Sequence, residues 1–183
     1  MYEVELKGYA NDEIFKRVRE RFEFIRKEVH EDIYYQHPCR DFSKTDEALR
    51  IRIKKFNGHY EVFLTYKGPK IDERSKTRLE IEIEISEPEK YFKLLEELGF
   101  REVLRIVKTR EKYYVSKGIT ITLDEVEGLG KFVEIETLAK EREEIPGIVN
   151  KLEKILRDLG VNTFERRSYL ELLLERSQKS QRT

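Results

Sequence analysis

Cysteine, tryptophan, methionine and proline are scarce in this chain. Its 183 residues include one cysteine, one methionine, four prolines and no tryptophan. The single cysteine, Cys39, excludes an intrachain disulfide framework and a zinc site built from several cysteines, and it favours a reducing, cytoplasmic setting. The three histidines, His30, His37 and His59, are not spaced as metal ligands. We therefore interpret them as structural or surface residues and assign Cys39 no catalytic role.

Long apolar runs and a net charge are also missing. No stretch approaches the roughly 20 apolar residues of a membrane-spanning helix, and the N-terminal segment is a charged strand without a signal-peptide core. Lysine plus arginine and aspartate plus glutamate each total 37, so the formal net charge is zero. Global charge therefore gives no reason to expect a membrane or nucleic-acid partner. Yet 40% of the residues are charged, well above the roughly 25% of ordinary domains, so their local arrangement must carry the argument.

The dominant pattern is a two-residue alternation of charged and apolar side chains, which predicts β-strands with one polar and one apolar face. Asn57-Gly58 and Lys117-Gly118 are typical hairpin turns. The spacing predicts a helix over 11–24 with Asn11 as its N-cap, and a second helix after Ser86, which has capping-box spacing with Glu89. The expected strands cover 2–8, 28–37, 48–67 (a hairpin ended by Gly68-Pro69), 78–85, 101–115, 119–126 and 131–138, with further helices over 146–159 and 168–175.

Most of these strands are neighbours in sequence joined by short turns, so we expect an α+β, mainly β fold with an antiparallel sheet. Eight open strands with one wet face would leave two edges to protect, whereas closure into a barrel removes them. We therefore predict a closed eight-stranded antiparallel β-barrel with helices packed outside and the charged face lining an inner cavity. The predicted organisation is one domain over residues 1–175 and a disordered polar tail over 176–183.

The polar faces of the predicted strands carry both acids and bases. Buried charges are costly unless they are paired, hydrated or bound to ions. Carboxylates bind hard cations such as Mg²⁺ or Mn²⁺, while arginine and lysine bind phosphate oxygens. The two sets together predict a metal–polyphosphate ligand, and they comprise Glu3, Glu5, Lys7, Arg50, Arg52, Lys54, Thr65, Lys67, Arg78, Glu80, Glu82, Lys108, Arg110, Asp124, Glu134 and Glu136.

These residues resemble, in order, the CYTH superfamily, the triphosphate tunnel metalloenzymes. Glu3-Val4-Glu5-Leu6-Lys7 resembles its ExExK signature, and the similarity covers roughly residues 1–170. The segments 34–42 and 45–52 are most similar to the class IV adenylate cyclase branch, with relation to the thiamine triphosphatases. The resemblance implies a tunnel that holds a triphosphate between basic side chains and a divalent metal on acidic ones, in an enzyme that transfers phosphoryl or nucleotidyl groups. It also makes a homodimer plausible.

Each candidate residue has a predicted role. The predicted metal ligands for Mg²⁺ or Mn²⁺ are Glu3, Glu5, Asp124, Glu134 and Glu136, with Glu80 and Glu82 as additional candidates or internal ion-pair partners. The predicted phosphate-binding residues are Lys7, Arg50, Arg52, Lys67, Arg78, Lys108 and Arg110. The predicted catalytic set is Glu3, Glu5, Lys7, Asp124, Glu134 and Glu136. Lys76 is a weaker phosphate candidate in an expected mobile loop, where plain solvent exposure is the alternative.

Three functions remain open on the residues alone. A class IV adenylate cyclase would convert ATP to cyclic AMP and pyrophosphate, and a triphosphatase would hydrolyse thiamine triphosphate, tripolyphosphate or a nucleoside triphosphate. The third is a non-catalytic nucleotide- or polyphosphate-binding module, and a purely structural barrel with internal ion pairs is a further rival. The expected partner is a triphosphate-containing small molecule. We expect Tyr169 and the leucine-rich segment after it to close the barrel rather than bind ligand.

Overall fold

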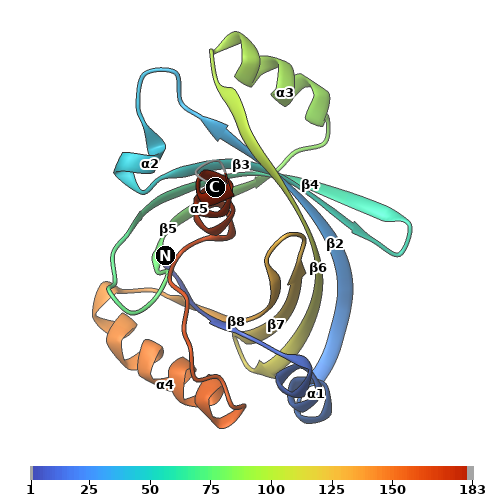
Figure 1. The fold of residues 1–183 in the computed structure, drawn as a ribbon, viewed down its shortest axis with the longest axis vertical. Coiled ribbons are helices and arrows are strands. Elements are labelled where there is room, and N and C mark those ends of the chain that lie inside the picture. The colour runs from blue at the N-terminus through green and yellow to red at the C-terminus, as the bar shows by residue number, and fades with distance from the viewer. Residues whose placement is uncertain (1, 181–183) are drawn as a thin grey trace.

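Alternation of charged and apolar residues gives the strands two unlike faces, and the chain encloses the charged face by closing the sheet on itself (Figure 1). The computed structural model describes residues 2–180 and contains one closed antiparallel barrel in the order β1-β5-β4-β3-β2-β6-β7-β8. The strands are β1 (Tyr2–Tyr9), β2 (Glu23–Gln36), β3 (Ala48–Phe56), β4 (His59–Lys70), β5 (Arg78–Glu84), β6 (Arg101–Ser116), β7 (Ile119–Val126) and β8 (Gly130–Ala139). The predicted fold class is confirmed.

The barrel closes through β1, which pairs with β8 on one side and with β5 on the other. Its pairing with β8 runs from Tyr2 opposite Ala139 to Tyr9 opposite Phe132. Its pairing with β5 is much shorter, and only Glu3 opposite Arg78 is in register. The β1–β5 seam is therefore the weakest hydrogen-bonded junction among the described strands.

Helices cover part of the outer surface. The helices are α1 (Asp12–Arg21), α2 (Phe42–Thr45), α3 (Pro88–Glu97), the 3₁₀ helix η1 (Arg142–Glu144), α4 (Ile145–Asp158) and α5 (Tyr169–Ser180). Unlike the outer helices, α5 packs on inward-facing side chains at one end of the barrel. Asn11 caps α1 as predicted, because its side chain accepts a hydrogen bond from the Ile14 amide at 2.9 Å. None of these helices in residues 2–180 has the length and apolar character needed to span a membrane.

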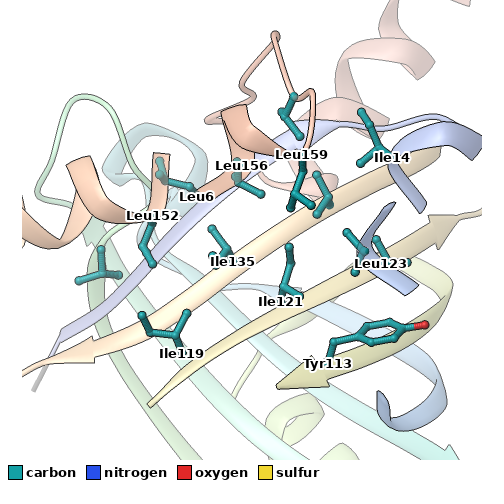
Figure 2. Packing of buried hydrophobic residues seen from close by; sticks show 14 of the residues in the cluster. Leu6, Ile14, Tyr113, Ile119, Ile121, Leu123, Ile135, Leu152, Leu156 and Leu159 are labelled. Carbon is teal, nitrogen blue, oxygen red and sulfur yellow. The ribbon is translucent and has the colours of Figure 1, made fainter. Parts of the chain in front are cut away.

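The largest apolar core lies between α1, α4 and the outer faces of β1, β7 and β8. Figure 2 shows Leu6, Ile121 and Ile135 from the strands packed beneath Leu152 and Leu156 of α4. All five side chains are nearly or completely buried. The predicted outer helical layer is therefore present on this side. On β5, by contrast, Leu79, Ile81 and Ile83 are about half exposed.

Several element boundaries differ from those predicted. The first helix ends at Arg21 rather than residue 24, because Glu23 and Phe24 already pair with β6. Gly68-Pro69 does not end its strand: β4 continues to Lys70 through a register shift, which accommodates the proline.

The helix after residue 86 also begins differently. Ser86 is not its cap, since the N-cap is Glu87, without a side-chain cap bond, and Pro88 occupies the first turn. The expected loop over 38–46 contains the short helix α2. At the C-terminal end, residues 176–180 of the expected disordered tail are helical in α5, and 181–183 lie outside the described residues.

Candidate active site

The inward-facing charges surround one cavity of about 660 Å³. It is lined by nearly all of the predicted site residues: Glu3, Glu5, Arg50, Arg52, Lys67, Arg78, Glu80, Glu82, Lys108, Arg110, Glu134 and Glu136. Lys7 and Asp124 are buried beside the cavity and contact residues that line it. The alternation therefore predicted correctly which residues share the inner face.

Two carboxylates meet on the β1–β8 side of the tunnel. Glu5 and Glu134 are both buried, and both accept hydrogen bonds from the ammonium of Lys76, at 2.6 and 3.2 Å. Burial and then the neighbouring Glu134 charge raise the pKa of Glu5. Burial opposes ionisation of Glu134 too, but Lys76 and Arg110 together hold its pKa well below the usual range. The Glu5–Glu134 pair therefore carries at least one negative charge, and the Lys76 ammonium contacts both carboxylates.

A second cluster surrounds Asp124 on β7. Its two oxygens accept bonds from the Arg110 guanidinium at 2.6 and 2.5 Å, from Lys108 at 3.0 Å and from the Tyr169 hydroxyl at 2.9 Å. Arg110 also pairs with Glu134, so it bridges the two acidic positions. Burial, followed by the charge of Arg110, lowers the pKa of Lys108 to about 8. Asp124 thus orients two of the predicted phosphate-binding cations.

The basic wall opposite is held by β3. Arg52 forms a two-pronged pair with Asp32 of β2, at 2.6 and 2.7 Å. Arg50 donates to the Thr65 hydroxyl at 3.2 Å and lies 3.6 Å from Glu82. Because each guanidinium is fixed by a strand neighbour, the two arginines are oriented before any ligand arrives.

The remaining predicted residues form pairs across neighbouring strands. Glu3 lies 3.7 Å from Lys67, which also pairs with Glu80. Burial and a hydrogen bond with Glu80 raise the pKa of Glu3 despite the nearby Lys67 charge. The ion pair between Glu80 and Lys67 is compatible with both predicted roles of Glu80, internal ion-pair partner and metal ligand.

Glu136 and Arg78 lie at other positions along the wall. Glu136 accepts from Thr120 at 2.9 Å and from Lys112 at 3.2 Å. Arg78 donates to the Asp46 backbone carbonyl at 3.4 Å. These side chains are each paired within the protein, so a ligand would exchange partners rather than meet bare charges.

Sequence reasoning missed the inner face of β2. Glu28, His30 and Asp32 are almost fully buried among the tunnel charges. His30 Nε2 lies 2.5 Å from Glu28, while burial and nearby cations lower the His30 pKa far below its usual value. His30 lies at the same two-residue spacing as Arg26 and Tyr34, a pattern visible in the sequence that could have identified the inner face of β2.

The alternative offered for Lys76, plain solvent exposure, is wrong. Its side chain is 12% exposed, and its backbone amide donates to the Glu5 carbonyl at 2.9 Å. The loop therefore continues the short β1–β5 seam and directs Lys76 into the tunnel.

The donor set fits a divalent cation of the magnesium type. Among residues 2–180 no three histidine, cysteine, aspartate or glutamate side chains are grouped as a ready metal site. Mg²⁺, however, is commonly held by one or two carboxylates together with water and phosphate oxygens. Glu5 and Glu134, which already share one ammonium, provide such a partial site.

The two ends of the cavity differ in polarity. At one end, Tyr169 and Leu172 of α5 pack on the inward-facing Tyr34, Ile106 and Phe132, and Figure 1 shows α5 within the ring of strands. The cavity passes beside this helix, where Tyr35, Phe42, Val103, Leu170 and Leu174 line it together with acidic residues that include Asp46, Glu47 and Glu171. The other end is lined by charged residues such as Arg26, Glu28, Lys54 and Lys112. The Tyr169 segment packs across this end of the barrel, as predicted, and it also lines the cavity through Tyr169, Leu170 and Leu174.

Comparison with known proteins agrees with this geometry. Residues 1–169 match the model of the CYTH domain. The PH1819 protein of Pyrococcus horikoshii OT3, a solved structure, is 81% identical, with a TM-score of 0.94 over 95% of this chain and 99% of its own.

Two named relatives come from other organisms. MJ0240 of Methanocaldococcus jannaschii, described as a candidate adenylate cyclase, is 42% identical over 94% of this chain and 98% of its own length. Adenylate cyclase CyaB of Aeromonas hydrophila is 29% identical over 76% and 69%. From its barrel, its inner charges and its match over nearly the whole length, the chain belongs to the CYTH family.

Proposed function

We propose that this protein is a metal-dependent adenylate cyclase that converts ATP to cyclic AMP and pyrophosphate. The observation that carries the proposal is the enclosed cavity, in which arginines and lysines face a carboxylate pair suited to a cation. A triphosphate with about four negative charges requires such a set of cations to be held away from bulk water. The adenylate cyclase names of two relatives support the choice of reaction.

The basic wall supplies the grip on the phosphates. Arg50 and Arg52 are fixed by their strand neighbours, and Lys108 and Arg110 are fixed by Asp124. A triphosphate between these two groups would have its chain immobilised, so that one phosphorus faces one nucleophile. A Mg²⁺ or Mn²⁺ ion at Glu5 and Glu134 would supply charge neutralisation at the phosphate oxygens.

In the proposed reaction the ribose 3′-oxygen attacks the α-phosphorus. A new phosphorus–oxygen bond forms, the bond between the α-phosphorus and the bridging α–β oxygen breaks, and pyrophosphate leaves while the hydroxyl proton is released. The cations on the wall stabilise the charge that builds up on the leaving pyrophosphate. In a triphosphatase the same grip would present the terminal phosphorus to water instead.

The polarity of the cavity ends favours a nucleoside over a bare polyphosphate. The end beside α5 offers Tyr35, Phe42 and Leu170, which suit an adenine ring, whereas the opposite end offers charged groups. The triphosphate would then extend from this apolar end into the charged middle of the tunnel. This orientation places the α-phosphorus nearest the nucleoside end, as cyclisation requires.

Product analysis tests the proposal directly. Purified protein is incubated with Mg²⁺ or Mn²⁺ and, separately, ATP, thiamine triphosphate or tripolyphosphate. We expect cyclic AMP and pyrophosphate from ATP, in equal amounts. Orthophosphate without cyclic AMP would make the protein a triphosphatase, and absence of any product with retained binding would make it a binding module.

A further inference from the structure

One lysine occupies the place in the tunnel where a cation is needed. The Lys76 ammonium lies between Glu5 and Glu134, 2.6 Å and 3.2 Å from one oxygen of each. The Lys76 side chain is 12% exposed, and those of Glu5 and Glu134 are 9% and 5% exposed. Three charged groups are thus assembled out of solvent, with the Lys76 ammonium bridging the two acids while Arg110 also pairs with Glu134.

The loop that carries Lys76 is built to deliver it. Ile71 and Thr77 close the loop by a backbone hydrogen bond of 2.9 Å. Asp72 accepts from the backbone amides of Arg74 at 2.9 Å and Ser75 at 2.7 Å, which fixes the turn. Ser75 and Thr77, the neighbours of Lys76 in sequence, are buried. None of these loop-fixing bonds uses the Lys76 side chain, so its flexible four-carbon stem can change partner without breaking them.

A second element holds the same loop from outside. The Arg166 guanidinium donates to the backbone carbonyls of Asp72 at 2.6 Å and Ser75 at 3.2 Å. Arg166 belongs to the segment before α5, whose neighbour Glu165 donates its amide to the Lys7 carbonyl of β1 at 2.8 Å. The loop backbone is therefore anchored on two sides.

An ammonium and a divalent cation cannot share the same two carboxylates, because their like charges would lie within a few ångströms of each other. We propose that Lys76 is a built-in substitute cation: it neutralises Glu5 and Glu134 in the free protein, leaves them when a divalent cation binds, and then contacts the triphosphate. This inference rests on the cation site of the proposed function. It gives Lys76 two successive partners, carboxylate first and phosphate second.

The proposal makes removal of one positive charge act in opposite directions on two ligands. Without Lys76, Glu5 and Glu134 repel each other and attract a divalent cation more strongly, so Mn²⁺ alone should bind more tightly. The bound triphosphate, in contrast, loses one charge-assisted contact and should bind more weakly. Removal of a lysine that served only to fill the tunnel would not tighten the binding of Mn²⁺ while weakening that of the triphosphate.

Calorimetric titration tests both directions. Wild type, Lys76→Met, Lys76→Arg and the control Lys54→Met are titrated with MnCl₂ alone, then with tripolyphosphate at saturating Mn²⁺. Lys54 also lines the tunnel, but its ion-pair partner is Glu82 at 3.8 Å. We expect Lys76→Met to bind Mn²⁺ about tenfold more tightly than wild type and tripolyphosphate about tenfold more weakly. Lys76→Arg should remain near wild type for Mn²⁺, and Lys54→Met should not tighten it.

The unfavourable outcomes separate the inference from the proposed function. Equal Mn²⁺ affinity in Lys76→Met and wild type overturns the role of Lys76 alone, and so does Mn²⁺ binding that is seen only together with tripolyphosphate. Tighter Mn²⁺ with unchanged tripolyphosphate affinity overturns the transfer to phosphate. Failure of wild type to bind tripolyphosphate with Mn²⁺ overturns the proposed function as well. If Lys76→Met does not fold, Lys76→Gln, which keeps a polar end, replaces it in every arm.

Discussion

The same inward face of the barrel is apolar at one end and charged in the middle. On β6, Ile106 belongs to the apolar cluster under α5, while Lys108, two residues further along, is a buried cation of the tunnel. On β8, Phe132 and Glu134 show the same change. Two residues of a strand span about 7 Å, so the polarity of the environment changes within one repeat of the pleat.

A single strand therefore contributes to the stability of the fold at one position and to the ligand cavity two residues away. The apolar end excludes water and buries aromatic surface, which stabilises the folded state. The charged middle is compensated by pairs such as Arg52–Asp32, which at best offset the cost of removing both charges from water. Substitutions at the two places should therefore have different consequences, stability at one and ligand handling at the other.

The largest stability loss is expected at the apolar end. Phe132 is 1% exposed and packs against Tyr169 and Tyr9, with ring centroids 5.0 and 5.1 Å apart. Phe132→Ala should lower the free energy of unfolding by about 3–5 kcal/mol, measured by urea denaturation. Phe132→Leu serves as the milder control, since it retains most of the buried volume. A loss below 1 kcal/mol in the alanine variant would contradict the view that this cluster seals the barrel.

The next largest effect concerns turnover, with stability preserved. Glu5→Gln and Glu136→Gln each keep the side-chain volume but remove a predicted metal ligand, so we expect the rate of product formation to fall about a hundredfold or more. The melting temperature should change by only a few degrees. Glu125, exposed on the outer face of β7, provides the control Glu125→Gln, which should retain its rate. Full activity in both tunnel variants would remove these carboxylates from the metal set.

A smaller effect is expected on the basic wall. Arg52→Ala should weaken the binding of tripolyphosphate by about 10- to 100-fold, because one charge-assisted contact to phosphate is lost. The same change leaves Asp32 buried without its partner, which adds a stability cost unrelated to ligand. The double variant Asp32→Asn/Arg52→Ala relieves that cost. If the double variant binds as tightly as wild type, Arg52 does not contact phosphate.

Much of the barrel could be predicted because its physics is local. Strict alternation fixes which residues share a face, so Glu3, Glu5, Arg50, Arg52, Glu134 and Glu136 were placed together correctly. Asn57 and Gly58 both adopt positive φ, of 48° and 77°, as the turn residues predicted. Where local and tertiary preferences disagree, prediction failed: the first helix lost its last turn to pairing between β2 and β6.

The rest depends on contacts between distant segments. Lys76 lies in a polar stretch that resembles any surface loop, and only its bond to the Glu5 carbonyl across the barrel seam brings it inside. Asp32 was readable as an inward residue, but its role became visible only once Arg52 was seen opposite it. Pairing partners of buried charges are set by register across strands, which periodicity along one strand does not encode.

The smallest expected effect lies where the two regions join. Glu165 accepts hydrogen bonds from the Tyr9 hydroxyl at 2.7 Å and from the backbone and side chain of Arg167 at 2.8 and 2.9 Å. Burial alone would raise the pKa of Glu165, but the bonds from Arg167 lower it to about 2. The pKa of a glutamate in an unfolded chain is about 4.3. The carboxylate therefore stabilises the fold fully above about pH 4.3, and this contribution is lost as the pH falls toward 2.

Glu165→Gln should consequently be less stable than wild type at pH 7 by about 1–2 kcal/mol, a decrease of about 3–6 °C in melting temperature. The difference between the two proteins should shrink as the pH is lowered from 5 toward 2, because wild type loses there what the variant lacks throughout. Glu143, which is exposed, gives the control Glu143→Gln, for which the difference should stay near zero. A Glu165→Gln difference that is constant with pH would mean that packing, rather than the ionised carboxylate, joins β1 to the segment leading into α5.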